Sequence, residues 1–163
     1  MFVFVDRKGG KALDAGFRAE MLRHLERFRL AGHDLDLGQP IYVPLDVALS
    51  VCVARGYFAS AVARSLRERL STGENQRGER GFFHPDHFSF GQGLPLSRLL
   101  EAVMSVAGVA SVKVELFQRW GKVANQERER GLISAAALEI LRLDDDPNFP
   151  ENGRLVLNME GGA

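Results

Sequence analysis

A strict alternation of apolar residues with other residues over 42–53 limits the possible folds more than any other part of the sequence. Every second position holds a large aliphatic side chain: Val43, Leu45, Val47, Leu49, Val51 and Val53. A period of two places all of these side chains on one face of a β-strand, so we predict a strand with one buried face. Pro44 lacks the N–H that a ladder needs, which predicts that the strand begins at a sheet edge.

Helical spacing appears on both sides of this strand. The apolar residues that define it are Phe17, Met21, Leu25 and Phe28 before the strand, and Phe58, Val62, Leu66 and Leu70 after it. We expect Asp14 to cap the first helix and Gly32 to end it. A third helix is expected between an N-cap at Ser97 and a stop at Gly108.

Shorter apolar segments at 2–6, 34–37, 109–119, 138–143 and 154–159 predict further strands, with Val112, Val114 and Leu116 sharing a face. Loops are expected at 72–81 and 120–134. The order of elements predicts an α+β fold with a mostly antiparallel sheet and helices packed on one face. A ferredoxin-like arrangement is an alternative for part of it. We expect one domain over residues 1–163, or two small lobes divided near 40–45.

Composition excludes several classes of protein. The chain has 163 residues, 45% of them hydrophobic, and a formal net charge of +0. This mixture is typical of a globular domain, and its neutrality predicts neither a nucleic-acid partner nor a membrane partner. Cys52 is the only cysteine, so no disulfide forms within the chain. We expect its thiol to be packed inside the long strand.

His84, Asp86 and His87 are the candidates for a metal site, because imidazole and carboxylate groups both bind zinc. No second pair of Cys or His ligands accompanies them. A proline-containing turn is therefore the favoured interpretation, and a metal- or ligand-binding module is the alternative. We predict no cofactor and no metal.

An oxygen-rich loop at 144–152 resembles a calcium loop superficially. The glycine and the final glutamate that an EF-hand requires fall on Phe149 and Leu155, so a tight turn is the better interpretation. No motif for nucleophilic, phosphate-binding or dinucleotide chemistry is present. We predict that the chain is not an enzyme; a cell-wall hydrolase is a less favoured alternative.

Aromatic residues and arginine are common at protein interfaces. The interface candidates are Phe82, Phe83, Phe117, Arg119 and Trp120. The competing interpretation for each aromatic residue is a place in the core.

Several short segments, in the same order, resemble one family. They are RFRLAGHDL (27–35), PLDVAL (44–49), GFFHPD (81–86), FSFG (88–91), LSRL (96–99), VAGV (106–109), LDDDPN (143–148) and PENGRL (150–155). Together they resemble the C-terminal part of the baseplate J-like proteins, in the branch of baseplate assembly proteins from phage-tail-like contractile injection systems.

The resemblance implies a structural role in the baseplate, with other baseplate or wedge proteins as partners and no catalytic residues. It implies assembly in the cytoplasm and then a place in a phage-tail-like particle. Members of the family are longer, so we expect this chain to be a fragment of a longer protein or the product of a split gene. An open sheet edge would then invite a homo-oligomer.

Overall fold

The long strand β3 (Ile41–Val53) is the central strand of the main sheet in this computed structural model, which describes residues 1–29, 32–75 and 77–162. One edge of β3 pairs antiparallel with β5 (Val109–Arg119). The other edge pairs parallel with β7 (Glu139–Arg142) and then with β8 (Arg154–Gly161). The fold is α+β, as predicted, but its sheet is mixed rather than mostly antiparallel. Long connections through helices and loops allow the parallel pairings.

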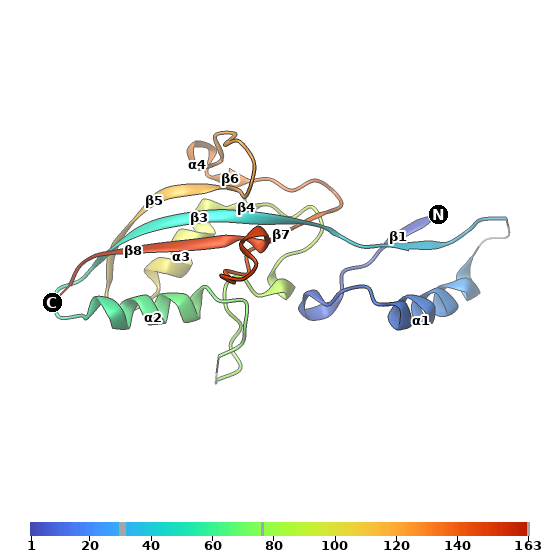
Figure 1. Cartoon of the computed structure of the whole chain (residues 1–163), viewed down its shortest axis with the longest axis horizontal. Helices are drawn as coiled ribbons and strands as arrows, with labels where there is room; N and C mark the ends of the chain where they lie inside the picture. Colours follow the sequence, from blue (N-terminus) through green and yellow to red (C-terminus); the bar gives the residue numbers. More distant parts are fainter. Residues whose placement is uncertain (30–31, 76, 163) are drawn as a thin grey trace.

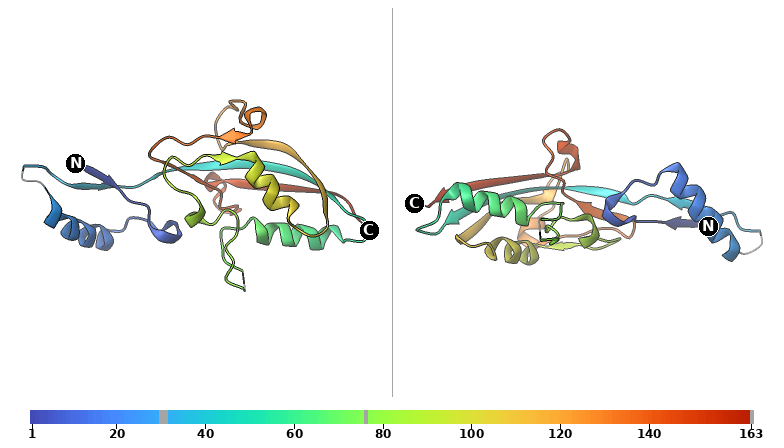
Figure 2. Two further views of the ribbon diagram at one scale, coloured as in Figure 1. Left: turned by 180° about the vertical axis from the view of Figure 1, so that it is seen from behind. Right: turned by 90° about the horizontal axis from the view of Figure 1, so that it is seen from below.

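The helices α2 (Ala59–Arg69) and α3 (Leu96–Met104) lie on the same side of this sheet (Figure 1, Figure 2). The alternating aliphatic residues of β3 face them, and Leu45, Val47, Leu49 and Val51 are fully buried. The core also contains Val62 and Leu66 of α2 and Leu99 and Val103 of α3. The strand and its buried face are therefore confirmed.

Pro44 lies where pairing on one side of β3 ends. The ladder with β5 begins at Leu45, opposite Arg119. The backbone N–H of Trp120 donates to the Pro44 carbonyl beyond the ladder (2.8 Å). In a strand, the N and the C=O of one residue point to the same side. The Pro44 nitrogen, which carries no hydrogen, therefore points past the end of β5, where no donor is needed.

The opposite face of the sheet carries Asp46, Ser50 and Cys52, and the Cys52 thiol is exposed rather than packed. An irregularity in β5 places Leu116 opposite Ala48 but Val114 opposite Leu49. Leu116 therefore leaves the core face, and the prediction that it shares a face with Val112 and Val114 is wrong. A bulge of this kind cannot be read from the apolar pattern alone.

Residues 1–29 and 32–38 form a lobe that projects from one end of the body (Figure 1). Its elements are β1 (Phe2–Phe4), the 3-10 turn η1 (Lys8–Gly10), α1 (Ala15–Leu25), the 3-10 turn η2 (Glu26–Phe28) and β2 (Asp36–Gly38). β1 and β2 pair parallel as direct neighbours, with α1 in the connection. A ferredoxin-like split arrangement would place another strand between them, so the lobe does not have it.

The ends of two helices differ from the prediction. Asp14 caps α1 as predicted, accepting from the Phe17 N–H (2.8 Å). The α-helix ends at Leu25, before Gly32, and Phe28 is 73% exposed instead of packed. α3 begins at Leu96 with Pro95 at the N-cap position, so Ser97 lies in the first turn and is not the cap.

The remaining elements are short: η3 (Pro85–His87), β4 (Leu94–Pro95), α4 (Glu127–Arg130), β6 (Leu132–Ile133) and η4 (Pro150–Asn152). β4 pairs antiparallel with β6, which lies inside the predicted loop at 120–134. Glu74 and Arg80 form an antiparallel bridge, so the described residues of 72–81 form a small hairpin. No helix in the described ranges has the length and apolar character needed to cross a bilayer.

Candidate functional site

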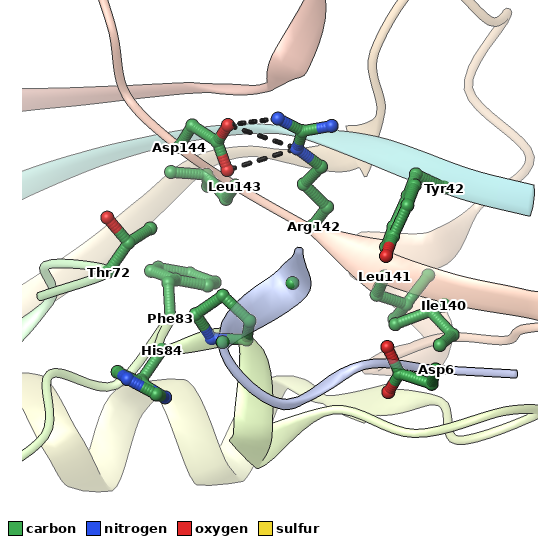
Figure 3. A pocket seen from close by; sticks show the side chains of 13 residues that line it. Asp6, Tyr42, Thr72, Phe83, His84, Ile140, Leu141, Arg142, Leu143 and Asp144 are labelled. Atoms are coloured by element: carbon green, nitrogen blue, oxygen red, sulfur yellow. Dashed lines mark hydrogen bonds and ion pairs between the residues drawn. The ribbon is translucent and has the colours of Figure 1, made fainter. Parts of the chain in front are cut away.

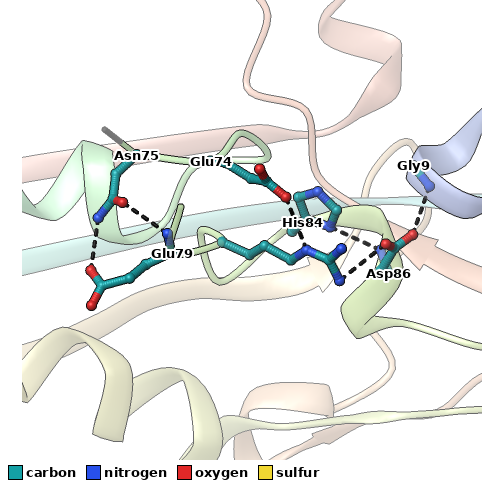
Figure 4. Close-up of polar contacts among 7 residues, drawn as sticks. Gly9, Glu74, Asn75, Glu79, His84 and Asp86 are labelled. Atoms are coloured by element: carbon teal, nitrogen blue, oxygen red, sulfur yellow. Dashed lines mark hydrogen bonds and ion pairs between the residues drawn. The ribbon is translucent and has the colours of Figure 1, made fainter. Parts of the chain in front are cut away.

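The 84–87 segment lies at the contact between the lobe and the body. The Asp86 carboxylate accepts from the backbone N–H of Gly9 in the lobe (2.6 Å) and pairs with Arg80 of the hairpin (3.1 Å; Figure 4). The Asp86 N–H donates to His84 Nδ1 (3.2 Å). Asp86, which lies in η3, thus contacts both the lobe and the hairpin.

The groups around Asp86 favour the charged form of its carboxyl. The Gly9 hydrogen bond, followed by the charge of Arg80, lowers the pKa of its carboxyl. Gly10 has a φ of +64°, and a Cβ added to it would lie 3.2 Å from the ring of Pro85. Glycine therefore permits the close approach of η1 to η3.

The three candidate metal ligands do not converge on one point. Asp86 is occupied by Gly9 and Arg80, His84 accepts from the backbone, and His87 Nδ1 lies 3.3 Å from the Phe82 carbonyl oxygen. Over the described ranges, no three His, Cys, Asp or Glu side chains are grouped so that they could hold a metal ion.

A cavity of about 280 Å³ opens between η1 of the lobe and the body (Figure 3). Asp6, Tyr42, His84, Arg142 and Asp144 are among its polar lining residues. Arg142 Nε donates to both oxygens of Asp144 (3.1 and 3.0 Å), and Nη2 adds a further bond. This ion pair neutralises two of the charges that line the cavity.

The other polar groups of the cavity are not arranged as a catalytic relay. Burial, and then the charge of Asp86, raises the pKa of Asp6. Burial, and then Asp6, raises the pKa of Tyr42. Figure 3 marks hydrogen bonds only between Arg142 and Asp144 among the residues drawn. A nucleophile and a base within hydrogen-bond reach, as covalent catalysis requires, are not found among these lining residues.

The oxygen-rich loop at 144–152 uses its carboxylates to close a turn. Asp145 accepts from the Leu155 N–H (2.9 Å), and Asp146 accepts from the Asn148 N–H (2.8 Å). With Asp144 held by Arg142, the three consecutive acids have three different partners. The turn interpretation therefore fits better than a calcium loop.

The aromatic interface candidates lie mainly in the core. Phe82, Phe83 and Phe117 are at most 5% exposed, and Phe83 stacks on Phe88 with ring centroids 6.1 Å apart. Their burial favours the competing interpretation, a place in the core, for all three. Phe82 and Phe83 lie in an irregular stretch, where residue type alone could not reveal their burial. Phe117 lies in β5, where the bulge places it opposite Val47 on the core face.

The other two interface candidates lie where β5 ends. Arg119 donates to both carboxylate oxygens of Glu139 (3.1 and 2.7 Å) and to the Ser134 carbonyl. Trp120 is half-buried. Arg119 thus ties β5 to β7 within the chain, and only part of the Trp120 surface is left for a partner.

Sequence reasoning did not single out three aromatic side chains of the lobe as exposed. Phe2, Phe4 and Phe28 are 68%, 37% and 73% exposed, whereas Leu37 is the only fully buried hydrophobic residue among the described residues of the lobe. We call Phe2, Phe4 and Phe28 the lobe aromatic residues. One signal was available: consecutive apolar residues in 2–5 leave no polar face for water.

No family model matches the chain, and no curated protein matches it.

Proposed function

We propose that this chain is a structural component of the baseplate of a phage-tail-like contractile injection system, where it acts through protein–protein contacts. The observation that carries the proposal is the projecting lobe, which leaves its aromatic residues exposed. Exposed aromatic side chains that gather on one part of a molecule are typical of surfaces that bind another protein. Eight segments resemble baseplate J-like proteins in the same order, which supports the baseplate as the assembly in which the chain acts.

The partners in this proposal are other baseplate or wedge proteins. A lobe that projects from the body can reach a neighbour without disturbing the main core. Asp86 and Gly10 hold the lobe against the body, so a contact on the lobe would transmit force to the central sheet. The proposed site of action is the cytoplasm during assembly and then the particle.

The proposal also states that the chain is not an enzyme. The cavity beside the lobe supports this, because Arg142 and Asp144 neutralise each other there. The metal-binding alternative has no such support, because His84, Asp86 and His87 each contact other groups of the chain.

The test is deletion of this coding segment from the native gene, followed by negative-stain electron microscopy of sheathed particles. We expect sheaths and baseplates to be lost, and to return when the wild-type segment is supplied. Complete contractile particles in the deletion strain would contradict the proposal.

A matched pair of variants separates the lobe from the body in the same assay. Phe28→Asp changes a lobe residue that is 73% exposed, and Phe58→Asp changes a residue of the body that is 69% exposed, at the N-cap of α2. Asp is a favourable N-cap residue. We expect Phe28→Asp to reduce particle number and Phe58→Asp to support normal assembly.

A further inference from the structure

The two outer edges of the small β1–β2 sheet differ in how their backbone groups are satisfied. On β2, the Leu37 carbonyl accepts from Arg18 Nη1 (2.9 Å), and the Leu37 N–H donates to the Asp36 carboxylate (2.9 Å). Arg18 also pairs with Asp36. The outward groups of β2 are therefore occupied by charged side chains, which protects this edge from further pairing.

The outer edge of β1 has no such protection. The Met1 carbonyl accepts from Asp36 N–H (3.0 Å) and the Val5 N–H donates to the Gly38 carbonyl (3.1 Å), so the odd-numbered residues point to β2. By alternation, the N–H and C=O groups of Phe2 and Phe4 point to the outer edge. Within the described part of the chain, no hydrogen bond from another segment reaches these four groups.

The edges of the main sheet carry charged residues that β1 lacks. β5 presents Lys113 and Glu115, and β8 presents Arg154 and Glu160. β1 consists of Phe2, Val3 and Phe4 alone. Charges on an edge strand discourage pairing with another chain, and an apolar strand without them favours it.

We propose that β1 pairs antiparallel with β1 of a second copy of this chain, with Phe2 opposite Phe4 of the second copy. A two-fold axis then passes beside Val3. In this register the outward groups of Phe2 and Phe4 exchange hydrogen bonds with those of Phe4 and Phe2 of the second copy, as a hydrogen-bonded antiparallel pair requires. The inference goes beyond the baseplate proposal and does not depend on it.

The side chains fit the same arrangement. Leu37, the buried residue of the lobe, shares a face with Val3, whereas Phe2 and Phe4 point to the other face. A two-fold axis perpendicular to the sheet keeps each face on its own side. Four phenylalanine rings would therefore meet as two cross-strand aromatic pairs on one face of the joined sheet.

A second copy is the occupant that the strand itself favours. The register is self-complementary, because Phe2 and Phe4 are the same residue type on both sides of Val3. The pairing segment carries no charged side chain, so a partner of opposite charge is not needed. Because the strand is short, we expect the interface to be smaller than the roughly 1,200 Å² of a stable complex. The dimer should therefore depend strongly on protein concentration.

Sedimentation velocity of the whole chain, from micromolar to millimolar concentration, tests the pairing. We expect a monomer–dimer equilibrium in the wild-type chain. Phe2→Lys should weaken dimerisation about tenfold or more, because it removes both cross-strand aromatic pairs and adds one charge to the edge of each copy. Phe58→Lys is the matched control, since Phe58 and Phe2 are 69% and 68% exposed, and it should leave the equilibrium unchanged.

Charge-bearing double variants test the register. Phe2→Lys with Phe4→Lys, and Phe2→Glu with Phe4→Glu, should each be monomeric, and a mixture of the two should form a heterodimer. Phe2→Lys with Phe4→Glu should dimerise by itself, because each introduced ammonium group would face an introduced carboxylate of the second copy. Circular dichroism of each variant shows whether the fold is retained.

Three outcomes would overturn the inference. The first is a wild-type chain that stays monomeric at millimolar concentration. The second is a Phe58→Lys variant that loses the dimer as Phe2→Lys does. The third is equal behaviour of the like-charged and the oppositely charged double variants, which would mean that a different strand or face makes the contact. None of these results bears on particle assembly, so the baseplate proposal is tested separately.

Discussion

Arg154 holds the Asp46 carboxylate with two hydrogen bonds, from Nε and Nη2, each 3.0 Å long. The two residues are 108 positions apart in sequence and directly opposite each other in the parallel β3–β8 ladder. Asp46 lies on the sheet face opposite to α2 and α3, yet it is only 7% exposed. A bidentate, charge-assisted pair of this kind is stronger than a neutral hydrogen bond. It fastens the last strand to the central one.

Removing Arg154 should therefore leave a nearly buried carboxylate without its partner. We expect Arg154→Ala to lower the free energy of unfolding by about 1–3 kcal/mol in urea denaturation. Arg64→Ala on the exposed surface of α2 is the control, with an expected change within about 0.5 kcal/mol. Equal effects of the two substitutions would show that the pair adds nothing to stability.

Asp86 predicts a pH-dependent contact between the lobe and the body. Its pKa is lowered in the folded chain, chiefly by the Gly9 N–H. The stabilisation is therefore present above the pKa of the unfolded chain and is lost as pH falls through the lower, folded value. In an NMR titration we expect the Gly9 amide shift to report a pKa below that of an ordinary Asp. Asp86→Asn should abolish this titration, and an unperturbed pKa at Gly9 would contradict the geometry.

Gly153 is required by the turn that precedes β8. Its φ is +107°, and an added Cβ would lie 2.9 Å from Leu143 Cα and 3.1 Å from the Leu45 carbonyl oxygen. We expect Gly153→Ala to cost about 1–3 kcal/mol from backbone strain, with the steric collision added to it. Gly73→Ala, in open space, should be close to neutral. Thermal unfolding of both variants measures the difference, and a neutral Gly153→Ala would refute the packing argument.

Phe83 and Phe28 separate core aromatic residues from surface ones. Phe83 is 2% exposed and packs against the rings of Phe82 and Phe88, whereas Phe28 is 73% exposed. We expect Phe83→Ala to lower the free energy of unfolding by about 3–5 kcal/mol. Phe28→Ala should change it by less than about 0.5 kcal/mol. Denaturant unfolding distinguishes the two, and a small loss for Phe83→Ala would argue against its place in the core.

The candidate sites show where prediction from sequence stopped. His84, Asp86 and His87 are neighbours in sequence, but Gly9 and Arg80 determine what Asp86 does. Phe82 and Phe83 resemble interface residues by type, and burial removes them from the surface. An open sheet edge was expected from the resemblance, but which edge of β1 is open depends on how β1 and β2 pair.

Local signals in the sequence were enough to identify most of the strands and α2. The alternation over 42–53 identified β3 and its buried face, the spacing from Phe58 to Leu70 identified α2, and the 109–119 segment matched β5. Side-chain periodicity acts within a few residues, so a single segment contains it.

Long-range features became visible only in the folded chain. They are the parallel pairing of β7 and β8 with β3, the departure of Leu116 from the core face, and the pairing of Asp46 with Arg154. Each depends on contacts between residues that are distant in sequence. The packing of the whole chain sets the free energy of such contacts, so no single segment of the sequence contains their signal.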